Sequence, residues 1–146
     1  MIQGGVTFAA MALPVRESSS GPLDVDLALV LAVDISRSIT KDEHREQLDG
    51  YAAAFRSGAV LGAIASGANG VIAVTLLEWA ATAKTIQAVG WTLIRNGASA
   101  ERFAASIEAV PYTPKKGTSI GCMHVIGEMA FTADRLLRSA LAGPLH

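Results

Sequence analysis

VDLALVLAVDISRS, residues 25–38, is the stretch from which the rest of the chain can be placed. Its apolar run, residues 27–33, is too short to cross a membrane but suits a strand buried on both faces of a parallel sheet. Three oxygen-bearing side chains, Asp34, Ser36 and Ser38, follow that run at alternate positions. Because ligands of open α/β sheets bind beyond the carboxyl ends of the strands, the stretch predicts a binding site here.

Composition limits the function classes that fit the chain. It has 146 residues, of which 51% are hydrophobic and 17% charged, so one folded domain is expected. The net charge is −1 and the basic residues are scattered, which gives no surface for nucleic acid. Cys122 is the single cysteine, so an internal disulfide and a multi-cysteine metal site are excluded. No stretch approaches the roughly 20 apolar residues of a membrane span.

The first 23 residues have the character of a leader or flexible arm. A short apolar patch, residues 6–13, is followed by the polar, serine-rich residues 16–21. This order loosely resembles the end of a secretory signal, although no Lys or Arg precedes the patch. An export signal and a disordered arm are both open, so the compartment is unknown and export is one alternative.

Apolar periodicity predicts an alternation of strands and helices after residue 24. Thr40 and Glu43 form a capping-box pattern that begins a helix, whose apolar face is Leu48, Tyr51, Ala52, Phe55 and Ala59. Ser99 is expected to cap a later helix that directs Phe103, Ile107 and Val110 inward. The predicted order is strand 25–34, helix 40–59 with 60–65 continuing or restarting it, strand 71–79, strand 85–94, helix 99–109, loop 111–117 and a last helix from 119.

The predicted strands leave one edge without a neighbour. The link formed by residues 80–84 is too short for a crossover helix, so the second and third strands should form an antiparallel hairpin. The first strand would then expose an apolar edge, which natural proteins avoid. We therefore expect either that C-terminal strands are missing or that a partner, or a second copy of the chain, covers this edge.

The side chains that follow the first strand suit a divalent cation. Asp34, Ser36 and Ser38 offer one carboxylate and two hydroxyls, which match the preference of Mg²⁺ for few carboxylates and several waters. Thr118, in the glycine-flanked loop GTSIG of residues 117–121, is the best candidate for a further oxygen. Turn and helix-capping duty is the plain structural alternative for Ser36 and Ser38.

These residues resemble the von Willebrand factor type A domain and its metal-ion-dependent adhesion site, whose pattern is Asp-x-Ser-x-Ser, then a lone Thr, then a lone Asp. Asp34, Ser36 and Ser38 match the first part and Thr118 the second. The segments LVLAVDISRSI, QLDGYAAAF, GVIAV with Glu78-Trp79, WTLI and GTSIG look like an uncharacterised bacterial subfamily of such domains. The similarity covers roughly residues 24–131, and we assign residues 24–146 to a partial domain of this type.

The resemblance implies a Rossmann-like three-layer sandwich with a mostly parallel sheet and an antiparallel edge hairpin. It also implies Mg²⁺ or Mn²⁺ bound by Asp34, Ser36 and Ser38, with Thr118 binding directly or through water. An open position on the cation would accept an acidic side chain of a protein ligand, so the resemblance implies binding and no enzymatic activity. The family's last Asp has no match, and Asp134 is not assigned to it. A C-terminally truncated domain with a weakly held cation is therefore expected.

The sequence leaves two alternatives open. Asp34 could be the nucleophile of a haloacid dehalogenase-like phosphatase, but Ser36 stands where such enzymes usually carry a second Asp. The chain could also be a non-functional truncated product. Among the other polar residues, Arg37 could contact an acidic ligand. Glu78 and His44 are expected to be solvated, and a supporting role behind the metal ligands is the alternative for Glu78.

Overall fold

The computed structural model describes residues 9–13, 25–80 and 83–114. The GTSIG loop with Thr118, the helix predicted from residue 119, and Asp134 lie outside the described residues. Within the described part, four strands and three helices follow one another along the chain: β1 (Ala9–Leu13), β2 (Leu27–Asp34), α1 (Lys41–Arg56), α2 (Gly58–Ala65), β3 (Ile72–Ala80), β4 (Ala83–Ile94) and α3 (Gly97–Glu108).

The described strands form one mixed sheet in the order β1-β2-β3-β4. β2 pairs with β3 in parallel, and β3 pairs with β4 in antiparallel orientation. A mixed α/β fold and the β3–β4 hairpin are thereby confirmed. The expected mostly parallel sheet is not seen in the described part, where β2–β3 is the single parallel pairing among three.

The edge of β2 that was expected to lie open is covered by β1. β1 runs antiparallel to β2 with Ala9 opposite Ala32 and Leu13 opposite Ala28. It comes from the apolar patch in residues 6–13, within the segment expected to be a leader or arm. The pairing is physically reasonable because backbone N–H and C=O groups along an apolar strand edge need hydrogen-bond partners.

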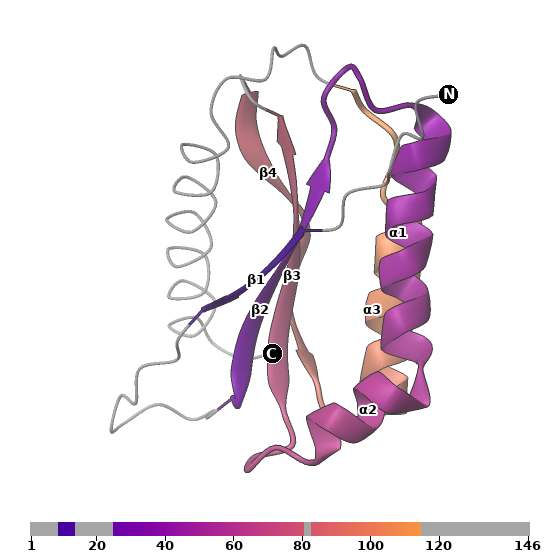
Figure 1. The fold of residues 1–146 in the computed structure, drawn as a ribbon. Helices are drawn as coiled ribbons and strands as arrows, with labels where there is room; N and C mark the ends of the chain where they lie inside the picture. Colours follow the sequence, from indigo (N-terminus) through magenta and orange to yellow (C-terminus); the bar gives the residue numbers. More distant parts are fainter. Residues whose placement is uncertain (1–8, 14–24, 81–82, 115–146) are drawn as a thin grey trace.

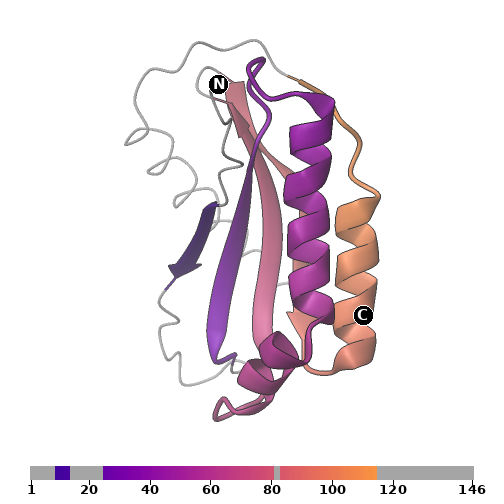
Figure 2. The ribbon, with the colours of Figure 1, turned by 45° about the vertical axis from the view of Figure 1, so that its right-hand side comes forward.

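All three described helices lie on one face of the sheet (Figures 1 and 2). α1 and α3 pack side by side on it, and the rings of Phe55 and Phe103 meet edge to face with centroids 5.0 Å apart. Phe103, Ile107 and Val110 are buried, as predicted, but Ala59 is exposed because the helix breaks before it. The core on this side is Leu31, Val33, Ile35, Leu48, Tyr51, Ala52, Phe55, Ile64, Ile72, Val74, Leu76, Ala80, Val89, Ile94, Ala100, Phe103, Ala104, Ile107 and Val110.

Side-chain caps fix where the helices begin. The predicted capping box at Thr40 is present at the start of α1. Ser57 ends α1 and caps α2, so the segment 60–65 belongs to a restarted helix. The predicted cap Ser99 was wrong by one turn. Asn96 caps α3, and the Ser99 hydroxyl accepts from the Asn96 backbone N–H in return, because the Asn side chain reaches the free N–H of Ser99.

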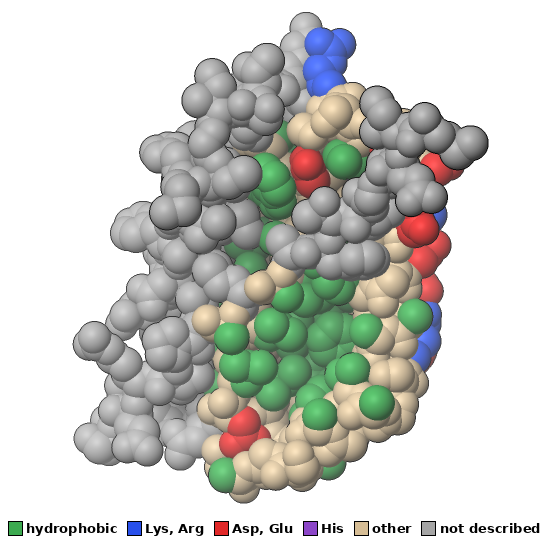
Figure 3. All heavy atoms as spheres, viewed as in Figure 1, with side chains coloured by type: hydrophobic (Ala, Val, Ile, Leu, Met, Phe, Trp, Pro, Cys, Tyr) green, Lys and Arg blue, Asp and Glu red, His purple; other side chains and the backbone are tan. Residues whose placement is uncertain are grey.

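Apolar side chains gather along the side of the sheet next to α2 (Figure 3). α2 has the sequence GAVLGAIA, without a charged residue, and only Ile64 in it is buried. Leu27, Leu29, Val60 and Leu61 are partly buried against the core at this end of the molecule. Among the described residues, the core is therefore less completely covered here than between α1 and α3.

Asp26 fastens the start of β2 to the loop that precedes β3. Its carboxylate accepts hydrogen bonds from the Asn69 backbone, the Asn69 side chain and the Val71 backbone at 2.9, 3.0 and 3.2 Å. A Cβ atom at Gly67 would lie 2.3 Å from its Oδ2 atom, so only glycine permits this close approach. The hydrogen bonds, first that from the Asn69 backbone, lower the pKa of Asp26 below its ordinary value.

We predict that Asp26→Asn lowers the thermal midpoint at neutral pH and reduces its dependence on acid. Because the pKa of Asp26 is lower in the folded than in the unfolded chain, its stabilisation is present above the unfolded pKa and is lost as the pH falls through the folded pKa. Thermal unfolding between about pH 5 and pH 2 measures this loss. The exposed Glu46→Gln variant is the control, and an equal acid response in both variants would contradict the prediction.

Arg56 joins the two long helices through a charged fork. Its Nη2 atom lies 2.7 Å from Glu101 Oε1 and its Nε atom 2.8 Å from Glu101 Oε2, while Nη1 donates to Glu108. The guanidinium lowers the pKa of both carboxyl groups, in each case chiefly through these hydrogen bonds. The groups are exposed, so salt should weaken their contribution to stability.

Arg56→Lys should lower the thermal midpoint in dilute buffer, since a lysine ammonium cannot serve two carboxylates with a planar fork. The difference from the wild type should shrink at about 1 M salt, where the Debye length is about 3 Å. Arg102→Lys changes an exposed arginine of the same helix pair and serves as the matched control. A loss for Arg56→Lys that is unaffected by salt would show that packing of the side-chain stem, not charge, holds this contact.

Candidate metal centre

The candidate site begins where β2 ends. Asp34 is opposite Trp79 in the parallel ladder, and the Ile35 backbone N–H donates to the Trp79 carbonyl at 2.9 Å. The chain then turns away from the sheet and enters α1 at Lys41. We call residues 34–39 the Asp-Ser loop. It lies at the carboxyl end of the parallel strand pair, where the sequence predicts a binding site.

Hydrogen bonds inside the Asp-Ser loop bring its three oxygen-bearing side chains to one place. The Ser36 backbone N–H donates to Asp34 Oδ1 at 2.7 Å. A turn is closed by the Ile39 N–H, which donates to the Ser36 carbonyl at 3.0 Å. The hydroxyl oxygens of Ser36 and Ser38 are 3.0 Å apart. The loop therefore gathers Asp34, Ser36 and Ser38, while Thr118 lies outside the described residues.

The spacing of the two hydroxyls fits a small octahedral cation. Ligand oxygens of Mg²⁺ lie at about 2.0–2.1 Å from the ion, so adjacent corners of the octahedron are about 2.9 Å apart. Ser36 and Ser38 are hydrogen-bonded to each other at a similar separation, 3.0 Å, and Asp34 supplies a carboxylate on the same loop. Among the described residues there is no group of three or more His, Cys, Asp or Glu that could hold a metal ion. To a cation, the described residues of the Asp-Ser loop would thus offer one carboxylate, from Asp34, and the two serine hydroxyls, and water would complete the shell.

A capping box fixes the N-terminus of α1, the helix that follows the loop. Glu43 Oε2 accepts from the Thr40 backbone N–H at 2.8 Å and from the Thr40 hydroxyl at 2.9 Å, and the Glu43 N–H donates to that hydroxyl. These bonds, first that from the Thr40 backbone, lower the pKa of Glu43. Arg37, within the loop, is exposed. The loop is therefore fixed at its end, and Arg37 is accessible to a partner.

His44 and Glu78 are buried together behind the loop, which corrects the expectation that both are solvated. They are 2% and 4% exposed, and His44 Nε2 lies 3.1 Å from Glu78 Oε1. Sequence reasoning missed the pair although one signal was present. His44 precedes Leu48 by four residues and therefore lies on the same apolar face of α1.

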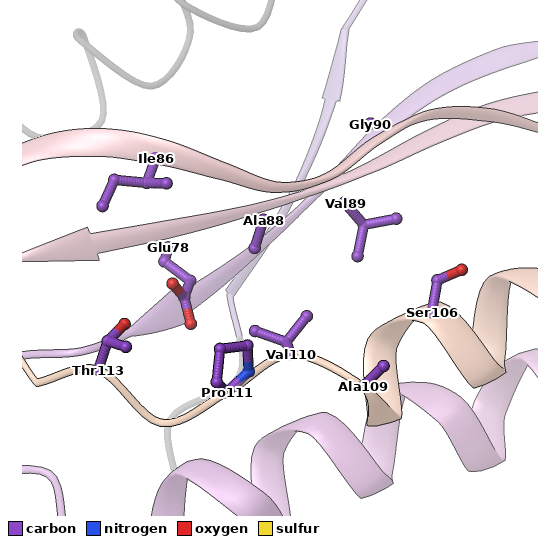
Figure 4. A pocket seen from close by; sticks show the side chains of 10 residues that line it. All are labelled: Glu78, Ile86, Ala88, Val89, Gly90, Ser106, Ala109, Val110, Pro111 and Thr113. Carbon is purple, nitrogen blue, oxygen red and sulfur yellow. The ribbon is translucent and has the colours of Figure 1, made fainter.

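Glu78 also borders an open hollow of about 600 Å³ between β4 and the end of α3. Figure 4 shows its carboxylate directed toward Val110 and Pro111, with Ile86, Ala88 and Val89 along the opposite wall. The hollow is mostly apolar. Its polar groups besides Glu78 are the hydroxyls of Ser106 and Thr113. None of the residues that line it belongs to the Asp-Ser loop.

Comparison with known proteins identifies the family. Neither the curated proteins nor the solved structures contain a match. In the described part of the chain, no helix has the length and apolar character needed to span a membrane. Residues 24–139, which include the whole Asp-Ser loop, match the family described as "Protein of unknown function (DUF1194)". The chain therefore belongs to this uncharacterised family.

Proposed function

We propose that this chain is a metal-ion-dependent protein-binding module of the von Willebrand factor type A kind. The observation that carries the proposal is the Asp-Ser loop, which follows a parallel strand. It carries the Asp34 carboxylate and holds the hydroxyls of Ser36 and Ser38 3.0 Å apart, a separation that two adjacent ligands of an octahedral cation also have. Asp34, Ser36 and Ser38 would hold Mg²⁺ or Mn²⁺, with Thr118 as a fourth contributor from outside the described residues. The proposal includes a Rossmann-like fold of the von Willebrand factor type A kind for the whole domain.

The donor set favours binding over catalysis. A divalent cation with one carboxylate ligand keeps a net positive charge, and when bound it would offer an open position to an acidic side chain of a protein ligand. Arg37 is exposed on the same loop and can add a second positive charge toward that ligand. Ser36 has no acid–base chemistry near neutral pH, so the loop lacks a partner for Asp34 as a phosphatase nucleophile.

Cation binding should stabilise the folded chain. At 100 times the dissociation constant, a ligand adds about 2.7 kcal/mol, which raises the thermal midpoint of a domain of this size by roughly 5–10 °C. We expect this rise with Mg²⁺ and Mn²⁺. Asp34→Asn should abolish it, because it removes the charge but keeps an oxygen for the Ser36 N–H. Asp49→Asn, on the exposed face of α1, is the control that should retain the response.

The absence of a cation response in the wild type would overturn the proposal. Turnover of a simple phosphate ester that Asp34→Asn removes would instead support the phosphatase alternative. A thermal response to the cation that survives Asp34→Asn would show that the cation binds at another part of the chain.

The bound cation should exchange one of its waters for a carboxylate. Mn²⁺ relaxes the protons of the waters it holds, so water-proton relaxation reports open coordination positions. We predict that acetate, added to the Mn²⁺-loaded protein, lowers this relaxation, whereas chloride at equal ionic strength does not. An acetate effect equal to that on free Mn²⁺, or none at all, would contradict an adhesion-type open position.

A further inference from the structure

The segment that follows α3 crosses the end of the sheet and reaches the Asp-Ser loop. Its first residues are anchored, since the Val110 N–H donates to the Ile107 carbonyl and the Val110 side chain is buried. Two residues later, the hydroxyl of Tyr112 donates to the Ile39 carbonyl at 2.7 Å. This single hydrogen bond joins positions that are 73 residues apart in the chain.

Ile39 is the last residue of the Asp-Ser loop, and both of its backbone polar groups are engaged. Its N–H closes the turn onto Ser36, and its carbonyl accepts from Tyr112. At the other end of the loop, the Ile35 N–H is held by the Trp79 carbonyl. The two serines therefore lie between two long-range hydrogen bonds, one to β3 and one to Tyr112.

The ring of Tyr112 is itself held in place. It packs on the imidazole of His44, with centroids 5.3 Å apart and the planes tilted by 57°. His44 is fixed in turn by the buried Glu78 of β3, one residue before Trp79. A continuous set of contacts thus runs from β3 through α1 and Tyr112 to the end of the Asp-Ser loop, and it restricts the rotamer from which the hydroxyl donates.

We infer that Tyr112 is a positioning residue for the Asp-Ser loop, which it holds through the Ile39 carbonyl in the conformation that gathers Asp34, Ser36 and Ser38. This inference rests on the proposed function for its consequence, cation affinity. Without the hydroxyl, the loop would have to be ordered when the cation binds, and that entropy would reduce the affinity. One hydrogen bond corresponds to a loss of roughly three- to tenfold in affinity.

The chain offers a matched pair of variants for the test. Tyr112→Phe keeps the ring against His44 and removes only the hydroxyl. Tyr51→Phe removes a tyrosine hydroxyl that lies 3.4 Å from the carbonyl of Ala32, a residue of β2 that is not part of the Asp-Ser loop. We expect Tyr112→Phe to weaken Mn²⁺ binding roughly three- to tenfold in calorimetry. Tyr51→Phe should leave the Mn²⁺ dissociation constant unchanged.

Amide hydrogen exchange in the metal-free protein separates this inference from the proposed function. Tyr112→Phe should speed exchange of the Ile39 amide severalfold relative to the wild type, whereas Tyr51→Phe should not. Faster Ile39 exchange in a protein that binds no Mn²⁺ would support the positioning of the loop and overturn the proposed function alone. Ile39 exchange unchanged by Tyr112→Phe, or equal losses of Mn²⁺ affinity in both variants, would overturn the role of Tyr112.

Discussion

β2 and β3 pair in parallel from Leu27 opposite Ile72 to Asp34 opposite Trp79, and the candidate site depends on this ladder. The interior of β2 is apolar throughout, so acidic residues occur only at its two ends. Asp26 is used at the amino end to fasten the loop before β3, and Asp34 is left at the carboxyl end. Parallel pairing then brings Glu78 and Trp79 to the same edge as the Asp-Ser loop. The position of the site follows from the topology.

The buried His44–Glu78 pair carries a desolvation free energy that opposes folding. Removing two polar side chains from water is unfavourable, and a buried pair of this kind is weak evidence for added stability. Here the pair connects β3 to α1 directly behind the loop, and it supports the ring of Tyr112. Its consequence is therefore geometric, because it orients a group that holds the loop. Deleting either partner would leave the other buried without its hydrogen bond.

Local patterns in the sequence predicted the individual strands and helices better than they predicted which strands pair with one another. The apolar run of β2, the capping box of Thr40 and the short link before β4 each contain their own signal, and all three were predicted. Asn96 was missed as a cap because Ser99, one turn later, is an equally good capping residue by type.

The pairing of β1 with β2 could not be predicted, because a short apolar patch is equally compatible with a leader. Asp34, Ser36 and Ser38 were predicted together since they follow one strand. Tyr112 was missed because its partner Ile39 is 73 residues away and contributes only a backbone carbonyl.

The composition of the Asp-Ser loop also determines how cation and partner would depend on each other. With one carboxylate and two neutral hydroxyls, the loop neutralises only half of the charge of a divalent cation. A second carboxylate from the loop would hold the cation more tightly but would remove its attraction for an acidic ligand. On the proposed function, the partner supplies the missing charge, so each should raise the affinity for the other by the same factor. Weak cation binding by the free chain would then make partner binding sensitive to cation concentration, because the loop is ordered in advance while its charge is completed only in the complex.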